Sequence, residues 1–206
     1  RNDNSKSFIS ITKKNSSYGL KQFVRSGQLL NIDRMVKELV TIDDNEIAGS
    51  VMNAPFDIEM VCTNCLTGRP EYLFEKKSIR RLIDIAKASC AVPIISSEVM
   101  ISGTPYVDGS VTDAVPVKRA LEIKKCDKAV VILTRKEGET PTNYKKASLF
   151  IKMAYHKKYP HLEYVLMHRL EEYNKQMEYL ESQVKAGNAF VIRPSISSIK
   201  RFETDQ

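Results

Sequence analysis

The chain has 206 residues, of which 42% are hydrophobic, and 32 Lys and Arg against 25 Asp and Glu give it a formal net charge of +7. This length and composition predict a globular chain with one sizeable buried core. No run of about 18 apolar residues occurs and the start lacks the charged-then-apolar pattern of a signal peptide, so we expect neither a transmembrane helix nor a secretory leader.

The first part of the chain is predicted to begin with a polar, loop-like segment at residues 1–17. Asn31 can then cap a helix from Ile32 to about Val40, because apolar residues fall on one stripe of it. The next helical spacing runs from Lys77 to Ser89. A polar connection from Asp43 to Gly49 follows the first of these two predicted helices.

A further helix is predicted from Val115 to Lys125, where Pro116 suits the first turn. Short apolar runs rich in Val and Ile stand between the helices, which is typical of buried strands. Strands that alternate with helices predict an α/β fold with a mostly parallel sheet.

The longest predicted helix spans residues 160–186, with Pro160 at its start and Gly187 just beyond its end. Apolar residues step along it by three and four positions, and they are Leu162, Leu166, Leu170, Tyr173, Met177, Leu180 and Val184. Such a stripe indicates packing against the protein core, with a partner-binding coiled coil as the alternative. His161 and His168 share a face of this helix and are interpreted as surface residues.

Positive charge gathers between Thr140 and Leu162, where no acidic residue occurs. The five lysines of this stretch are Lys145, Lys146, Lys152, Lys157 and Lys158. Apolar residues recur there at helical spacing, namely Ala147, Phe150, Ile151 and Ala154. A packed helix with a solvated basic face is the favoured interpretation, and peripheral contact with an anionic membrane is the alternative. No aromatic and basic pattern of a nucleic-acid-binding motif occurs, so we expect no nucleic-acid partner.

The four cysteines, Cys62, Cys65, Cys90 and Cys126, show no regular disulfide spacing, which favours reduced thiols. We therefore expect a cytoplasmic protein, for which the basic stretch offers peripheral contact with a membrane. The Cys62–Cys65 pair has the spacing of half a zinc site, but the second pair that structural zinc needs is missing. The pair is interpreted as structural, and the sequence predicts no metal site.

An Asp-Gly turn stands between a short apolar segment and a helix start, in the sequence Tyr-Val-Asp-Gly-Ser-Val-Thr-Asp of residues 106–113. Gly109 allows a sharp turn directly after Asp108. Taken alone, Asp108 reads as a residue whose side chain stabilises the turn. Asp113 is the rival acid, and we interpret it as a helix cap.

This block resembles the second catalytic motif of the patatin-like phospholipases, in which an Asp followed by Gly and a small residue supplies the base of a Ser-Asp dyad. Other stretches resemble that family in the same order, and they are Met60–Tyr72, Ala88–Pro93, Ala129–Arg135 and Phe190–Pro194. The resemblance implies a three-layer α/β/α sandwich with a mostly parallel central sheet. It also implies that Asp108 is the base, that Gly109 and Ser110 support its motif, and that Ser89 and Pro93 line the floor of the pocket.

The nucleophile of the family is missing from this sequence, since no Gly-x-Ser-x-Gly occurs in it. Ser89 has small neighbours but lacks the elbow of a nucleophile. We therefore expect a single patatin-like domain, incomplete at its amino terminus, that is the carboxyl-terminal part of a longer enzyme and inactive alone.

The resemblance implies a lipid acyl hydrolase that acts on phospholipid or other acyl esters without a cofactor. The alternative is a non-catalytic module that binds a membrane surface or a protein partner through its basic and amphipathic helices.

Overall fold

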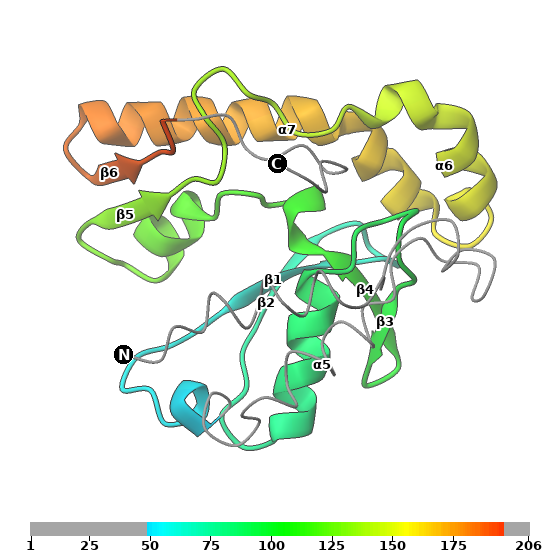
Figure 1. Cartoon of the computed structure of the whole chain (residues 1–206), viewed down its shortest axis with the longest axis horizontal. Helices are drawn as coiled ribbons and strands as arrows, with labels where there is room; N and C mark the ends of the chain where they lie inside the picture. The colour runs from blue at the N-terminus through cyan, green and yellow to red at the C-terminus, as the bar shows by residue number, and fades with distance from the viewer. Residues whose placement is uncertain (1–48, 196–206) are drawn as a thin grey trace, which may run out of the picture. The chain divides into compact units, whose positions relative to one another are not determined.

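The computed structural model describes residues 49–195 (Figure 1). The predicted polar segment at residues 1–17 and the predicted helix from Ile32 to Val40 lie outside the described residues. The chain forms two compact units. Among the described residues, the first contains residues 49–112 together with Leu149–Val165, and the second contains Asp113–Ser148 and residues 166–195. The single patatin-like domain stays a prediction.

The first unit contains a four-stranded sheet in the order β2-β1-β4-β3. Its strands are β1 (Met60–Asn64), β2 (Pro70–Leu73), β3 (Val99–Ile101) and β4 (Thr104–Asp108). Every pairing in this sheet is antiparallel. The expectation of a mostly parallel sheet is therefore not met by these four strands.

Short connections explain the antiparallel pairing of consecutive strands. Only five residues separate β1 from β2, and Gly68 turns the chain there with φ of 63°. Ser102 and Gly103 alone join β3 to β4, with φ of 50° and 84°. Positive φ at both central residues is the geometry of a tight hairpin, whereas a parallel pair needs a crossover of about a dozen residues or more.

Helix α5 (Ile79–Ser89) packs against β1, β3 and β4 (Figure 1). Ser78 caps it, because its Oγ accepts a hydrogen bond from the backbone N–H of Arg81 at 3.3 Å. The buried core between helix and sheet consists of Cys62, Ile85, Ala88, Ile101 and Tyr106. The helix predicted from Lys77 to Ser89 is thus confirmed to within two residues.

The basic stretch forms a short 3-10 turn, η3 (Tyr144–Ala147), followed by helix α6 (Ser148–Tyr155). Ile151 and Tyr155 are its buried residues. Phe150 and Ala154, which the spacing placed with Ile151, are exposed.

Helix α7 (Pro160–Lys185) confirms the long helix predicted over residues 160–186. Its part from Leu166 onwards packs in the second unit against a two-stranded parallel sheet, β5 (Ala129–Ile132) and β6 (Ala189–Ile192). The buried residues of this core are Val115, Val117, Val131, Tyr173 and Leu180. None of the helices in residues 49–195 is long and apolar enough to cross a membrane.

The other face of the parallel pair is apolar and exposed. Its outward side chains are Val130, Ile132, Phe190 and Ile192. Within the described part of the chain, no third strand pairs with either outer edge. An open hollow of about 270 Å³ lies against this region, lined by residues 114–117, Ala120 and residues 129–133.

The helix predicted from Val115 to Lys125 is shorter than expected. It contains a π-helical turn, η2 (Arg119–Ile123), in which the N–H of Lys124 reaches back five residues to the carbonyl of Arg119. Lys125 then has φ of 55°, which ends the helical path. At the start, the backbone N–H groups of residues 114 and 115 donate to Oε1 of Gln176 from α7. Between these ends the helical residues run from 117 to 123, seven in place of the eleven predicted.

Candidate functional site

Asp108 lies at the last position of β4 and begins the 3-10 turn η1 (Gly109–Val111). Its Oδ1 accepts a hydrogen bond from the backbone N–H of Ser110 at 2.8 Å. The turn-stabilising role expected of an Asp before Gly is therefore present. The second carboxylate oxygen, Oδ2, makes no hydrogen bond to any of residues 49–195, so it is open to a further partner.

Two neighbouring segments fix the backbone of Asp108. Its N–H donates to the carbonyl of Ala91 at 2.9 Å, and its own carbonyl accepts from Oγ1 of Thr63 at 2.9 Å. The two hydroxyls of Thr63 and Thr112 also share a hydrogen bond of 2.9 Å. The buried side chain of Thr63 on β1 thus binds residues on both sides of the Asp108 turn. These bonds fix the backbone that carries the Asp108 carboxylate.

Gly109 is buried where the turn passes closest to β1. A Cβ atom at this position would lie 2.1 Å from the carbonyl oxygen of Val61 and 2.4 Å from its carbonyl carbon. The obstacle is backbone, which cannot rotate away as a side chain can. Glycine is therefore required here by close approach, which gives the Asp-Gly pair a structural reason.

Ser89 and Pro93 lie in the segment that ends α5 and passes Asp108. The Ser89 Oγ donates to the same Val61 carbonyl at 2.8 Å, and Pro93 is fully buried. The structure places Ser89, Gly109 and Val61 together, but it engages the Ser89 hydroxyl in a backbone bond. Neither Ser89 nor Pro93 lines the hollow beside β5, and their place on a pocket floor stays a prediction.

One residue after Pro93, the backbone of Ile94 has φ of 72°. Positive φ is uncommon for a β-branched residue and costs roughly 1–3 kcal/mol. The Ile94 N–H donates to the hydroxyl of Tyr155 in α6 at 2.9 Å, which holds the unusual conformation. The strained position therefore lies close in sequence to Ala91, the residue that binds the Asp108 backbone.

The thiols near Asp108 are not activated. Burial, followed by the charge of Asp108, raises the pKa of Cys62 to about 12. Burial, with a smaller contribution from Glu98, raises the pKa of Cys65 to about 12 as well. The pKa of Cys90 is also raised, first by burial and then by Asp108. All four cysteines are free thiols, and these three are protonated at neutral pH, which makes them poor nucleophiles.

A polar network holds the turn between β1 and β2. Asn64 donates to Oε1 of Glu71 at 2.7 Å, and the hydroxyl of Tyr106 donates to Oε2 of the same carboxylate at 2.6 Å. Oδ1 of Asn64 accepts from the backbone N–H groups of residues 66 and 67. Burial, together with the bond to Glu71, raises the pKa of Tyr106 to about 12. This network thus supports β1, the strand that pairs with β4 at Asp108.

Sequence reasoning missed Thr63 and Gln176. Thr63 lies within the Met60–Tyr72 block, but its bond to Asp108 depends on the register that sets Cys62 opposite Asp108. No signal in the sequence specifies that register. Gln176 lies on the predicted long helix, and only the packing of α7 reveals that it binds residues 114 and 115.

The five lysines of the basic stretch divide into two groups. Lys145 forms an ion pair of 2.7 Å with Glu171, and Lys158 pairs with Glu98. The other three, Lys146, Lys152 and Lys157, are exposed and form no ion pair with a residue in the described range.

The histidines do not assemble a metal site with other side chains of the described range. His156 Nδ1 lies 2.7 Å from Oε2 of Glu163, and His161 is exposed. No group of three or more His, Cys, Asp or Glu side chains able to hold a metal ion occurs between residues 49 and 195.

Comparison with known proteins gives two family matches. Residues 8–121 match the family described as Patatin-like phospholipase, and this range contains Ser89, Pro93 and residues 108–110. Residues 159–206 match a domain of unknown function, DUF6363. The chain is also similar to the Uncharacterized protein YjjU of Escherichia coli (strain K12), with 28% identity over 120 residues. The aligned stretch covers 56% of this chain and 32% of that protein, so the chain spans about a third of the length of this curated relative.

Proposed function

The chain belongs to the patatin-like phospholipase family, and from that premise we propose that it forms part of a lipid acyl hydrolase in which Asp108 is the catalytic base. The family predicted from the sequence is confirmed, since the match covers residues 8–121. Membership supports a hydrolase of the esterase and phospholipase type. The catalytic dyad, the substrate and the activity of the whole protein are the proposal.

The observation that carries the proposal is the geometry of Asp108. One carboxylate oxygen is fixed by the Ser110 N–H, the backbone is held by Ala91 and Thr63, and Oδ2 has no partner among residues 49–195. A base needs such a fixed carboxylate with one oxygen available to the proton it accepts.

In the proposed reaction, a serine hydroxyl attacks the acyl carbonyl carbon while Asp108 accepts the hydroxyl proton. The C–O bond to the leaving alcohol then breaks, and the alcohol takes up the proton. Water hydrolyses the acyl-serine ester to release the fatty acid, with Asp108 again accepting a proton. Donors to the oxyanion are needed in both steps. We propose that the serine and these donors come from a segment outside the 206 residues, since the sequence has no Gly-x-Ser-x-Gly.

The proposed substrates are phospholipids or other acyl esters, and the proposed location is the cytoplasm, in part at a membrane surface. On this proposal the 206 residues by themselves are inactive. An Asp108-dependent esterase activity of these residues alone would contradict the proposal that the nucleophile lies outside them.

The test is ester hydrolysis by the intact protein on a soluble short-chain acyl ester, with Asp108→Asn compared with Asp113→Asn. We expect Asp108→Asn to lower kcat/KM by about 10²-fold or more, because a positioned general base contributes that much. Asp113→Asn, the matched control in the same block, is expected to keep activity. Folding of each variant is checked by circular dichroism and by the urea midpoint.

Full activity of a folded Asp108→Asn protein would overturn the role of Asp108. Lack of ester hydrolysis by the folded intact protein itself would favour the second candidate, a non-catalytic membrane-binding module. The exposed apolar and basic side chains of α6 are the observation that favours this candidate.

A further inference from the structure

Helix α6 has a buried side and an unusually apolar exposed side. Ile151 and Tyr155 are buried in the first unit. In contrast, Leu149 is 66% exposed, Phe150 is 67% exposed and Met153 is 77% exposed. Met153 lies four positions after Leu149 and three positions after Phe150, so its side chain neighbours both of theirs on the helix surface. Three large apolar residues thus face outward within about one turn.

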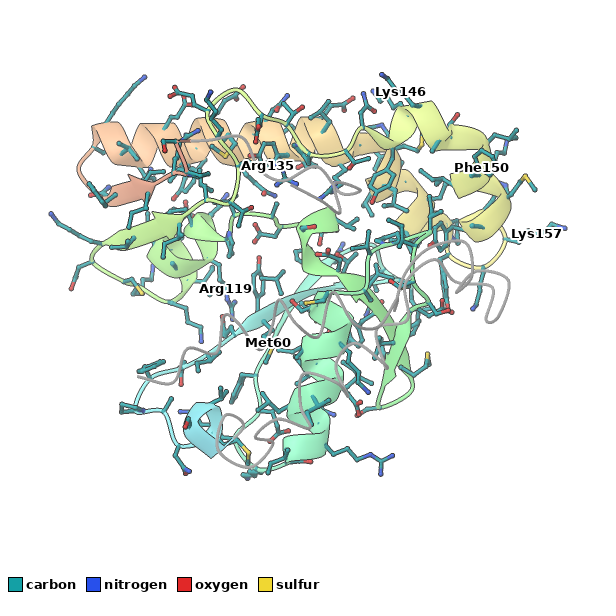
Figure 2. The ribbon with its side chains drawn as sticks, viewed as in Figure 1. Met60, Arg119, Arg135, Lys146, Phe150 and Lys157 are labelled. Carbon is teal, nitrogen blue, oxygen red and sulfur yellow. The ribbon has the colours of Figure 1, made fainter. Side chains whose placement is uncertain are left out.

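Two lysines adjoin these apolar side chains. Lys152 lies three residues after Leu149 on the helix, and Lys157 lies in the turn that follows the end of α6 at Tyr155. Both are exposed, and neither forms an ion pair within residues 49–195. Figure 2 shows the Lys157 side chain extending away from the sheet of the first unit. We call Leu149, Phe150, Lys152, Met153 and Lys157 the α6 patch.

Packing within the chain accounts for only part of α6. It explains Ile151 and Tyr155 of the helix, and Glu98 holds Lys158 in the turn that follows it. It gives no reason for Leu149, Phe150 and Met153, because a solvated helix face carries polar residues. Exposed apolar side chains that adjoin one another mark an interaction surface.

The charge around the patch indicates which partner fits it. Glu98 and Glu163 lie against this stretch and pair with Lys158 and His156, whereas Lys152 and Lys157 have no acidic partner among residues 49–195, so the patch has unbalanced positive charge. A second copy of this chain, with a net charge of +7, would bring like charges together. A helix surface with apolar residues flanked by lysines is instead the pattern that lies in the interface of an anionic bilayer.

We propose that the α6 patch docks on anionic phospholipid bilayers. Leu149, Phe150 and Met153 enter the boundary between headgroups and acyl chains, while Lys152 and Lys157 contact lipid phosphates. The inference deepens the proposed function, because it names the surface that would bring a lipid hydrolase to its substrate. Docking itself requires no hydrolysis.

The experiment is cosedimentation of the intact protein with vesicles of ether-linked lipids, which contain no acyl ester to hydrolyse. Vesicles of phosphatidylcholine with phosphatidylserine are compared with phosphatidylcholine alone. We expect binding that requires phosphatidylserine and weakens as salt rises, because salt screens the attraction.

Two sets of variants separate the charged and apolar contributions. Lys152→Gln with Lys157→Gln should weaken binding about 25-fold, at roughly fivefold for each lysine near an anionic surface. Leu149→Gln, Phe150→Gln and Met153→Gln together should weaken it by about tenfold or more, since three apolar side chains leave the bilayer. The control variants make the same kinds of change at exposed residues outside the α6 patch. Lys77→Gln with Lys128→Gln is the control for the lysines, and Phe56→Gln, Phe74→Gln and Met100→Gln together are the control for the apolar residues. Both controls should bind as the unchanged protein does.

Equal binding of the α6 variants and their controls would overturn the proposal, as would absence of binding by the unchanged protein. A third result would also overturn it: the unchanged protein forms oligomers, the α6 variants do not, and neither binds vesicles. The α6 patch would then bind a second copy of this chain.

Hydrolysis of a soluble short-chain ester distinguishes the two proposals. The α6 variants should keep that activity, whereas Asp108→Asn should lose it and still bind vesicles. Vesicle binding through the patch by a protein without esterase activity would leave docking standing and remove the proposed function.

Discussion

The two carboxylate oxygens of Asp108 have different roles: Oδ1 stabilises the turn, and Oδ2 is the proposed proton acceptor. Oδ1 accepts the Ser110 N–H, which an amide oxygen can also accept. An Asn at this position can therefore keep the turn while it loses the ability to take a proton. This division makes Asp108→Asn a test of chemistry rather than of folding.

Gly109→Ala is expected to destabilise the protein by about 1–3 kcal/mol, because the new methyl group would overlap the Val61 backbone and displace β1. The free energy of unfolding in urea measures the loss. Gly49→Ala is the matched control, since a Cβ there meets nothing within 4 Å. Equal stability of the two variants would show that the Asp108 turn can move away from β1 without lowering the free energy of unfolding.

At the residue scale, the sequence predicted the Asp-Gly turn but not what fixes it. Asp108 and Gly109 form a local signal, because adjacent residues determine a turn. The bonds from Thr63 and to Ala91 connect residues 45 and 17 positions away along the chain. Such partners depend on strand register, which a single sequence does not specify here.

At the element scale, the helical periodicity located α5 and α7 to within about two residues of their observed ends. Strand direction was predicted less well. The rule that alternating helices and strands form a parallel sheet held for β5 and β6, which α7 separates, and failed for the hairpin of β3 and β4. The three residues of β3 are too few to show alternation, so its tight turn went unrecognised.

The stripe of α7 leads to a prediction for the second unit. Leu180→Ala should lower the free energy of unfolding by about 2–5 kcal/mol, because Leu180 is fully buried in the core with Val115, Val117 and Val131. Val184 belongs to the same sequence stripe but is 41% exposed. Val184→Ala should change stability by less than about 0.5 kcal/mol. Equal losses in chemical denaturation would show that the stripe, rather than burial, determines the packing.

At the scale of the whole molecule, several acidic groups are held in their neutral forms by burial. The pKa values of Cys62 and Cys65 rise from 9.0 to about 12, and that of Tyr106 rises from 10.0 to about 12. In the unfolded chain these groups lose their protons at lower pH. Folding therefore becomes less favourable once the unfolded forms begin to ionise.

Stability is thus expected to be complete below about pH 8 and to fall as the pH rises towards 12, by up to about 4 kcal/mol for each buried thiol. Urea midpoints measured across the alkaline range provide the test. A Cys62→Ala, Cys65→Ala double variant should show a shallower decline than the unchanged protein. A midpoint that stays constant or rises above pH 9, in parallel for both proteins, would contradict the buried neutral state of these thiols.

The outward face of the parallel pair determines how the chain behaves at high concentration. This face carries four exposed apolar side chains, those of Val130, Ile132, Phe190 and Ile192. The outer edges of β5 and β6 pair with no other strand in the described part of the chain. An exposed apolar pair of strands with open edges is a template onto which a strand of another molecule can add. Self-association of a preparation of these residues should therefore begin at β5 and β6. Polar replacements at Val130 and Ile132, which leave inward Val131 in place, are the changes that would keep it dispersed.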